Sequence, residues 1–511
     1  MICSKYNFLF ISQKKEYLLY NSVTNNFVKV DEDTYNILNQ FKSSTINSDS
    51  SGFNEEFLNE LIEAKFLVEN DEDSLNKIKL ESYSQRYNKD VLSLTIAPTL
   101  HCNFSCPYCF EENRKSVYMT DETEEKLIEY IKSFSDIKHV SITWYGGEPL
   151  LAFKRIKSIT EKIRSIERCY GINSQTFEKI KAEGVDDETI NLLKKLENNF
   201  FQAENYFWEA VKNVIGIDAI IKNYAVIKKA CVAGIPLSAR MVSNGYLLTE
   251  DKIDDIIALN IRNIQITIDG LEITHNSRRN TKAGNSFQVI LKNIEKLFEK
   301  TNCVQIAFRI NVDSTNENEY AEVHNLLSEK FKGKNMYIYP GFVYSTYRKN
   351  EGCATVESCQ MDREKKSQFL LTQFPKLSNH KNNLYYPSLH HPECMARTIN
   401  CYLIDARGDI YKCWDDIGIK ERIIANLHQK GLDKINTTLL NKYLVGNDPY
   451  SNAECLNCFY LPICGGGCPY QRIHNAGKVD TCVVSKDRLN EFLETHYEIK
   501  KMRTKEKAGT V

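Results

Sequence analysis

The sequence predicts an α/β protein built around a parallel sheet. Between residues 92 and 345, short apolar stretches alternate with amphipathic stretches, the pattern of strands joined by helical crossovers. The length of 511 residues exceeds one compact domain, so further units are expected on either side. The third observation is the 17 cysteines, of which three fall at 102–109 and ten between 353 and 482.

Six strands and five helices are expected in the α/β part. The strands are expected at residues 92–97, 139–144, 237–242, 264–268, 304–312 and 336–344. The helices are expected near residues 121–134, 153–167, 250–258, 287–299 and 318–331. The repeat fits an open sheet or a partial barrel, and the pattern does not separate the two.

The flanks of this part have a different pattern. The first 78 residues read as strands followed by helices, with Asp31 as an N-cap, and a charged linker is expected at 79–91. An excess at about 168–215 predicts extra helices inserted between the second and third strands. Such an insertion forms a lid, a docking surface or an added packing layer.

Charge and composition exclude two classes of function. With 66 Lys plus Arg against 67 Asp plus Glu, the net charge is −1, so no global basic field recruits nucleic acid. No apolar run reaches the roughly 18 residues of a membrane span, and the first residues lack the features of a secretory signal. We therefore expect a cytoplasmic protein that binds no membrane. In that reducing compartment, many cysteines indicate metal ligands rather than disulfides.

Cys102, Cys106 and Cys109 directly follow the first expected strand. Their loop is therefore expected at the strand's carboxyl end, the edge where α/β proteins bind ligands. Three thiolates at this spacing can bind one [4Fe–4S] cluster and leave its fourth iron open to a small molecule. The alternatives are a zinc site, for which C-x3-C-x2-C is an unusual spacing, and reduced cysteines that bind nothing.

This spacing, with Tyr108 before the last cysteine, resembles that of the radical S-adenosylmethionine (SAM) enzymes. A second match is Gly146-Gly147-Glu148-Pro149 after the second strand, which in that family lies against the methionine end of SAM. The resemblance implies a partial (β/α)6 barrel over residues 92–345. It also implies reductive cleavage of SAM to a 5′-deoxyadenosyl radical, with a flavodoxin or ferredoxin-type protein as reductant.

Further strand ends match the family's cofactor site. Ser243 and Asn244 follow the third strand, Thr267 lies near the end of the fourth, and Arg309 lies in the fifth. The resemblance implies that Glu148 binds the amino group of SAM, that Asn244 and Thr267 bind its ribose, and that Arg309 binds its carboxylate. A purely structural role is the alternative for an Asn or Arg at a strand end.

The last third carries a second cysteine array that resembles the SPASM domain, a C-terminal extension of radical SAM enzymes. Its matching residues are Cys394, Cys413, Cys455, Cys458, Cys464, Cys468 and Cys482. The resemblance implies two auxiliary [4Fe–4S] clusters, hence three clusters in all; zinc is the alternative. One auxiliary cluster would use Cys455, Cys458, Cys464 and Cys482. The other would use Cys394, Cys413 and Cys468, with Cys401 as the nearest candidate for the fourth ligand and Cys353 or Cys359 as competitors.

The resemblance also implies the remaining domains. Residues 1–78 resemble the winged-helix-like module with which peptide maturases recognise the leader of a precursor peptide. Residues 346–393 would bridge to a SPASM domain at 394–490, and residues 491–511 would form a C-terminal tail.

SPASM proteins act mostly on peptides, so the expected substrate is a ribosomally made precursor peptide and the expected product a thioether from a cysteine. The competing interpretation is an anaerobic sulfatase maturase, which forms formylglycine. Those enzymes carry an Asp as base directly after the cysteine equivalent to Cys413. Here Trp414 stands there and Asp415 follows, which makes Asp415 the candidate base. An enzyme that forms C–C cross-links or epimers, and a scaffold that binds a peptide without catalysis, are the two remaining hypotheses.

Overall fold

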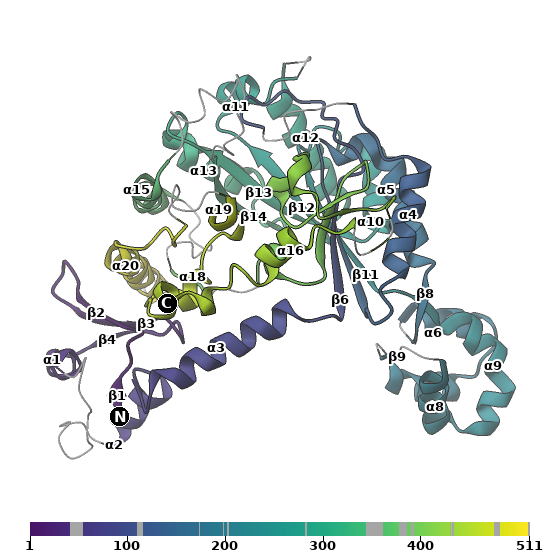
Figure 1. Cartoon of the computed structure of the whole chain (residues 1–511), viewed down its shortest axis with the longest axis horizontal. Helices are drawn as coiled ribbons and strands as arrows, with labels where there is room; N and C mark the ends of the chain where they lie inside the picture. Colours follow the sequence, from purple (N-terminus) through teal and green to yellow (C-terminus); the bar gives the residue numbers. More distant parts are fainter. Residues whose placement is uncertain are drawn as a thin grey trace.

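The computed structural model describes residues 1–40, 55–109, 116–172, 174–197, 199–201, 204–281, 284–343, 361–377, 386–389, 393–429, 431, 434–474 and 481–508. These residues form a nine-stranded sheet with flanking helices, an N-terminal module and a projecting lobe (Figure 1). None of the described helices combines the length and the apolar character needed to cross a membrane.

Six parallel strands make up most of the main sheet, in the order β14-β13-β12-β11-β7-β6. They are β6 (Val91–Ile96), β7 (His139–Trp144), β11 (Leu237–Ser243), β12 (Ile261–Ile268), β13 (Gln305–Val312) and β14 (Met336–Phe342). The crossover helices are α4 (Asp121–Lys132), α5 (Phe153–Arg164), α10 (Glu250–Ala258), α11 (Glu272–Arg278), α12 (Ser286–Lys300) and α13 (Tyr320–Lys330). The expected parallel α/β core is confirmed. Since the order of the described strands has two ends, the sheet is open.

Apolar side chains on both faces explain why these segments form a buried parallel sheet. In β13, six of the eight residues are buried, including the neighbours Phe308 and Ile310 on one face and Ala307 on the other. Helix α12 presents Ile290, Ile294 and other apolar residues to the same core.

The C-terminal region adds three strands to this sheet. β15 (Cys401–Ile404) pairs in parallel with β6, and β16 (Asp409–Tyr411) and β17 (Ala425–Asn426) continue antiparallel. The other described helices here are α15 (Arg363–Gln373), α16 (Thr437–Leu444), α17 (Ala453–Leu456), α18 (Leu461–Cys464), α19 (Pro469–His474) and α20 (Leu489–Ala508). The expected SPASM segment therefore shares the main sheet, and the expected tail is the continuation of α20.

The N-terminal module consists of strands followed by helices, as expected. It contains β1 (Ile2–Cys3), β2 (Asn7–Ile11), β3 (Tyr17–Asn21), β4 (Phe27–Val30), α1 (Glu32–Gln40), α2 (Glu55–Glu63) and β5 (Leu67–Val68). Strands β2, β3 and β4 form one antiparallel sheet, and β1 pairs with β5. In β3, Leu18 and Leu19 are both fully buried; because successive strand residues point to opposite faces, both faces of this sheet are covered.

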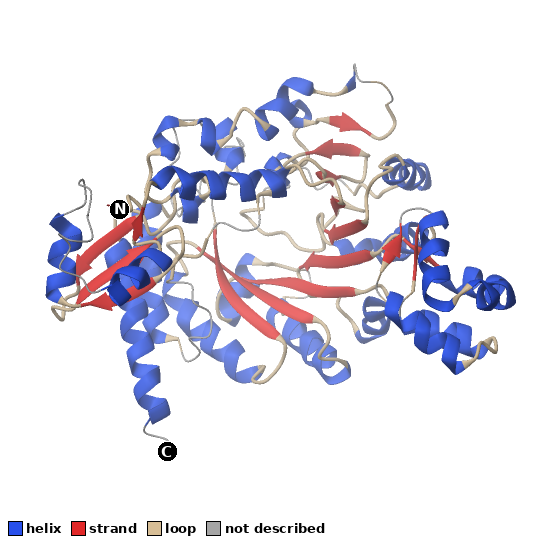
Figure 2. Cartoon of the chain, turned by 90° about the horizontal axis from the view of Figure 1, so that it is seen from below, coloured by secondary structure: helices blue, strands red, loops and turns tan. Residues whose placement is uncertain are grey.

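The helices that pack on the two faces of the β2-β3-β4 sheet come from opposite ends of the chain. Leu19 packs with Leu38 and Leu61 of α1 and α2. Leu18 packs with Leu489 and Leu493 of α20. Figure 2 shows α20 beside the three strands at the left of the view. The N-terminal module is thus attached to the C-terminal region.

The segment expected as a charged linker is in large part a helix, α3 (Asp71–Arg86). The Asn70 side chain caps it by accepting from the Asp73 N–H at 3.0 Å, and acidic residues in the first turn favour the helix dipole. At the other end the buried Arg86 guanidinium lies 2.7 Å from Asp448 and 3.4 Å from Glu393. This end of α3 is therefore fixed to the C-terminal region.

The insertion is longer than expected and forms a lobe from residue 167 to 234. Its elements are β8 (Glu167–Gly171), α6 (Ser174–Ala182), α7 (Asp187–Leu193), β9 (Phe200–Phe201), α8 (Glu204–Ile215), α9 (Ile217–Cys231) and β10 (Val232–Gly234). It has its own core, including Ile180, Phe207 and Ile227. The lobe leaves the main fold after α5 and rejoins it just before β11, and Figure 1 shows it projecting at the lower right. It is thus attached at the amino edge of the sheet, away from the loops after the strands, which is not the position of a lid over them.

Candidate functional site

Cys102, Cys106 and Cys109 lie on the loop that follows β6, at the carboxyl edge of the sheet, and all three are half-buried. Burial, the carboxylate of Glu148 and the thiols of Cys106 and Cys109 raise the pKa of Cys102 to about 12. These four groups therefore lie close together. A thiol with so high a pKa stays protonated at neutral pH and loses its proton when it binds a metal centre.

The turn after β7 packs against the backbone of the loop that leads to Cys102, Cys106 and Cys109 (the cysteine loop). This close approach leaves room only for glycine at positions 146 and 147. Gly146 has φ +112°, and a Cβ there would collide with the Thr99 carbonyl oxygen. A Cβ on Gly147 would collide with the His101 carbonyl oxygen and lie 2.5 Å from its carbonyl carbon. The Gly147 N–H donates to Thr99 O at 3.3 Å, and the Glu148 N–H donates to His101 O at 2.9 Å. The two sequence motifs are thus one structural unit.

Glu148 joins the ends of β7 and β11 from a fully buried position. Its Oε1 accepts from the Leu150 N–H at 3.0 Å and the Ser243 hydroxyl at 2.9 Å, and its Oε2 accepts from the Asn244 N–H at 2.8 Å. Burial raises its pKa, and these donors oppose that rise. Buried Pro149 begins the short 3-10 turn Pro149–Ala152 behind it. Glu148, Ser243 and Asn244, which the sequence singled out separately, are therefore in contact with one another.

Asn244 also reaches the cysteine loop. Its Nδ2 donates to Asn103 Oδ1 at 2.8 Å and lies 4.0 Å from the Cys102 sulfur. Asn103 was not among the expected site residues, and its position between two cysteines is the only signal for it in the sequence. The residues after β6, β7 and β11 thus form one continuous hydrogen-bonded site.

Thr267 on β12 and Arg309 on β13 are paired neighbours in the register of these two parallel strands. Next to them, Gly341 on β14 leaves the space in which the Arg309 side chain lies, because a Cβ there would collide with Arg309 Nε and lie 2.9 Å from its Cγ. Arg309 Nε is buried and has no hydrogen-bond partner among the described residues. A buried, unsatisfied guanidinium N–H at the carboxyl edge suits an anionic ligand.

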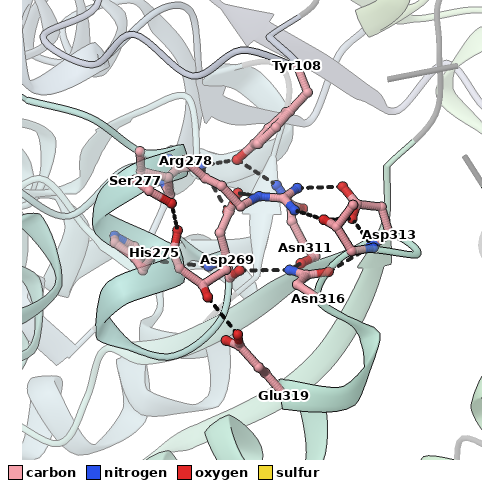
Figure 3. Close-up of polar contacts among 12 residues, drawn as sticks. Tyr108, Asp269, His275, Ser277, Arg278, Asn311, Asp313, Asn316 and Glu319 are labelled. Atoms are coloured by element: carbon pink, nitrogen blue, oxygen red, sulfur yellow. Dashed lines mark hydrogen bonds and ion pairs between the residues drawn. The ribbon is translucent and has the colours of Figure 1, made fainter. Parts of the chain in front are cut away.

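Tyr108 lies in a polar network at the ends of β12 and β13 (Figure 3). Its hydroxyl accepts from Arg279 at 2.9 Å and from Asn311 at 3.2 Å, and the Arg278 guanidinium lies over its ring at 5.3 Å. Burial and the Asp269 carboxylate raise its pKa well above the usual value. The side chain therefore connects the cysteine loop to these strand ends.

The rest of this network holds the two strand ends together. Arg278 makes ion pairs with Asp269 at 3.2 Å and with Asp313 at 2.7 Å. Asn316 Nδ2 donates to the carbonyls of Asp269 and Asn311 (Figure 3). Asn316 is absent from the sequence-based site because it lies beyond the strand-end residues that carried the resemblance.

Cys394, Cys413 and Cys468 form one set in the second array. Burial raises the pKa of both Cys413 and Cys468; Asp415 and Asp416 add to the rise at Cys413, and the Cys394 thiol adds to the rise at both, so Cys394 lies near each of them. Cys401, on β15, is half-buried, and its partial burial raises the pKa of its thiol, with Cys394 adding to the rise. The buried Lys412 Nζ donates to the carbonyls of Thr398 and Cys401, each at 2.6 Å. The competing ligands Cys353 and Cys359 lie outside the described residues.

Cys455, Cys458, Cys464 and Cys482 are the thiols expected to hold the other auxiliary cluster. Burial and the Cys455 and Cys458 thiols raise the pKa of Cys464. Two cations reach these sulfurs: Arg472 donates to Cys455 at 3.2 Å and Lys486 to Cys482 at 3.5 Å. Hydrogen bonds from cations stabilise thiolates that bind metal.

Three glycines connect the two sets between Cys464 and Cys468. Gly465, Gly466 and Gly467 all have positive φ, and a Cβ on Gly467 would collide with the carbonyl oxygen of Thr481, the residue before Cys482. The fully buried Arg397 donates to the carbonyls of Gly465 at 2.6 Å and Gly467 at 3.1 Å. This tight loop explains how neighbouring cysteines belong to different sets.

Trp414 and Asp415 point in different directions. The Trp414 ring lies 4.6 Å from that of Tyr145, which directly precedes Gly146, and its Nε1 donates to Met395 Sδ at 2.6 Å. Asp415 lies toward the second array, where Cys413 Sγ donates to its Oδ2 at 3.9 Å. Trp414, rather than Asp415, therefore borders the first cysteine site.

The donor sets differ from a mononuclear metal site. Within the described part of the chain, no three His, Cys, Asp or Glu side chains converge closely enough to hold a single metal ion. A cubane cluster does not need that convergence, because each thiolate binds a different iron. Thiols that are mostly half-buried, with Arg472 and Lys486 beside two of them, are suitable ligands for such a cluster.

Comparisons with known proteins agree with this site. Residues 96–242 match the Radical SAM superfamily. The radical SAM cyclopropyl synthase TigE of Paramaledivibacter caminithermalis is 24% identical over 199 residues, 33% of this chain and 42% of TigE. The serine-type anaerobic sulfatase-maturating enzyme of Bacteroides thetaiotaomicron is 29% identical over 167 residues, 28% of this chain and 37% of that enzyme. The chain thus matches less than half the length of either relative.

A solved structure extends the likeness of fold over most of the chain. The structure of anSMEcpe with bound AdoMet and Cp18Cys peptide superposes with a TM-score of 0.51 at 17% identity, covering 80% of this chain and 97% of that chain. Radical SAM enzymes use a [4Fe–4S] cluster and SAM, for which the loop of Cys102, Cys106 and Cys109 provides the ligands expected. Residues 96–242 are therefore a radical SAM domain, and the relatives that the chain resembles over part of its length are radical SAM enzymes.

Proposed function

We propose that this enzyme is a peptide maturase that cleaves SAM reductively and cross-links a ribosomally made precursor peptide through a thioether from a cysteine. The observation that carries the proposal is the attachment of the N-terminal module to the second cysteine array. The Ser22 hydroxyl donates to the carbonyl of Phe459 at 2.7 Å, and Phe459 directly follows Cys458. The unit that would bind a peptide is thus attached to the cysteine array that would hold the auxiliary clusters.

The N-terminal sheet offers edges for a peptide strand. Its order is β2-β3-β4, and among the described strands neither β2 nor β4 has a further partner. Both edge strands carry an exposed apolar side chain, Ile11 on β2 and Val28 on β4. An extended leader peptide can add to such an edge through main-chain hydrogen bonds.

The residues of the first site would bind and orient SAM. Cys102, Cys106 and Cys109 would hold a cluster that, when bound, supplies the electron for cleavage of the sulfonium. Arg309, with its unsatisfied Nε, would pair with the carboxylate of SAM, and Glu148 would accept from the amino group. The surrounding apolar residues, including Trp144 at the end of β7, exclude water from the site.

The two sets of the second array would hold auxiliary clusters. The set of Cys455, Cys458, Cys464 and Cys482 has four thiols. The set of Cys394, Cys413 and Cys468 has Cys401 beside it as the fourth candidate. Three [4Fe–4S] clusters per chain therefore belong to the proposal.

A sulfatase-maturating activity is the second candidate. The relative from Bacteroides thetaiotaomicron and the anSMEcpe fold favour it. The side chains around Cys413 favour the cross-linking enzyme, because Trp414 occupies the position of the base and Asp415 lies toward Cys413. C–C bond formation, as the name of the cyclopropyl synthase TigE suggests for that relative, is a variant of the leading proposal.

Product analysis separates these activities. The reconstituted enzyme is incubated anaerobically with dithionite, SAM and either a short Cys-rich peptide encoded beside its gene or a Cys-containing sulfatase peptide. A thioether product loses two hydrogens, keeps its sulfur and no longer reacts with a thiol reagent. Formylglycine in the sulfatase peptide, detected as an aldehyde with a hydrazine, would instead establish the second candidate and refute the first.

A further inference from the structure

Arg279 contacts the loop that carries Cys102, Cys106 and Cys109. One contact is between the first two cysteines and the other is between the last two. The residue is only 8% exposed. Its guanidinium donates to the hydroxyl of Tyr108, between Cys106 and Cys109, at 2.9 Å. The same group lies 5.5 Å from the ring centre of Phe104, between Cys102 and Cys106. One side chain therefore supports both intervals between the three cysteines.

The main chain after Arg279 supports the loop as well. The Ser105 N–H donates to the carbonyl oxygen of Asn280 at 3.1 Å. The Phe104 ring also contacts Tyr246 in an edge-on arrangement at 5.7 Å. The loop is thus held at positions 104, 105 and 108, and the segment 279–280 makes a contact at each of them.

The charge of Arg279 is less neutralised than that of its neighbour. Arg278 pairs with Asp269 at 3.2 Å and Asp313 at 2.7 Å, whereas among the described residues Arg279 makes one ion pair, with Asp269 at 3.5 Å. Arg279 Nε is buried without a hydrogen-bond partner among the described residues. Burial opposes the charge of Arg279, but Tyr108, Cys106 and Asp269 outweigh burial and raise its pKa. A cation is therefore kept beside the thiols.

We infer that Arg279 is a positioning residue for the SAM-cleaving site: it orders the cysteine loop through Tyr108 and Phe104, and its charge makes the bound cluster easier to reduce. A nearby cation stabilises the extra electron of a reduced cluster, and contacts around the ligands tune its potential. The inference rests on Cys102, Cys106 and Cys109 as the cluster ligands.

Three substitutions separate the two effects. Arg279→Gln removes the charge and the contacts, Arg279→Lys keeps the charge but loses the planar fork, and Tyr108→Phe removes one hydroxyl and keeps Arg279. Arg262→Gln is the matched control, because Arg262 is exposed at the amino end of β12. Hydrogen exchange of the loop amides is measured with and without cluster, and the midpoint potential is measured by EPR-monitored titration.

Arg279→Gln is expected to speed exchange of the loop amides by about ten-fold or more and to make the potential more negative. Arg279→Lys and Tyr108→Phe are expected to speed exchange while the potential stays near that of the unchanged enzyme. Wild-type exchange in both Arg279→Gln and Tyr108→Phe would overturn the positioning role. Equal potentials in Arg279→Gln and the unchanged enzyme would overturn the role of the charge. If the unchanged enzyme forms no cluster while Cys106→Ala behaves identically, the ligand assignment itself has failed.

Discussion

Gly147→Ala tests whether the turn after β7 must lie on the cysteine loop for SAM to bind. The added Cβ would collide with the His101 carbonyl oxygen and lie 2.5 Å from its carbonyl carbon and 2.8 Å from Leu100 O. All of these atoms belong to the backbone, so no side chain can move aside. The turn must either keep the clash or separate from the loop.

The retained clash and the separated turn cost similar amounts of free energy. A retained clash costs about 1–3 kcal/mol. Separation breaks the hydrogen bonds from Gly147 to Thr99 and from Glu148 to His101, which together contribute about 2 kcal/mol. If SAM binds only the assembled loop and turn, about 2 kcal/mol corresponds to a loss of affinity of about 30-fold.

Anaerobic equilibrium dialysis of SAM against the reconstituted enzyme measures this loss, with iron content determined on the same samples. Gly446→Ala is the control, because Gly446 also lacks a positive φ and its Cβ would come no closer than 3.3 Å to another atom. A Gly147→Ala enzyme with full iron and unchanged SAM affinity would refute the reasoning.

Three further predictions follow from single contacts. Gly341→Ala should displace the flexible Arg309 side chain and weaken SAM binding by about ten-fold without lowering the melting temperature; unchanged binding would contradict the role of Arg309. Burial and Asp409 raise the pKa of Asp405 to about 6, so its ionisation destabilises the folded state increasingly as the pH rises from about 4 to about 6. Asp405→Asn should therefore stabilise the fold by about 2 kcal/mol at about pH 8 and by less at about pH 5. An equal shift of the melting temperature at both pH values would contradict this prediction. Phe459→Ala should cost about 1–2 kcal/mol of docking between the N-terminal sheet and the second array, seen as faster proteolysis within residues 1–40, and unchanged proteolysis would count against that contact.

The parallel sheet could be predicted because its strands are short stretches rich in apolar residues that alternate with amphipathic helices. Ile264, Ile266 and Ile268 in β12 are all fully buried. Strand β15 could not be predicted in the same sheet, because its pairing of Cys401 with Ser93 joins distant segments and leaves no local pattern. Helix α3 was expected in part as a linker because only Ser82 and Arg86 of its 16 residues are buried, so its sequence shows no apolar period.

The site could be predicted where residue type and position coincide. The loop of Cys102, Cys106 and Cys109 and the Gly-Gly-Glu-Pro turn follow β6 and β7, the positions expected from the strand pattern. Spacing could not show that Tyr108 contacts Arg279, since 171 residues separate them. The extent of the lobe was underestimated because α9 and β10, at residues 217–234, belong to it, and a helix just before a strand of the sheet also fits an ordinary crossover.

Formation of 5′-deoxyadenosine is the most direct test of the central claim that Cys102, Cys106 and Cys109 hold the cluster that cleaves SAM. The reconstituted enzyme and its Cys106→Ala variant are incubated anaerobically with dithionite and SAM, and the nucleoside is quantified by chromatography. We predict that the unchanged enzyme forms 5′-deoxyadenosine and that Cys106→Ala forms none. An iron-loaded enzyme that yields no 5′-deoxyadenosine, or a variant that yields as much as the unchanged enzyme, would contradict the account.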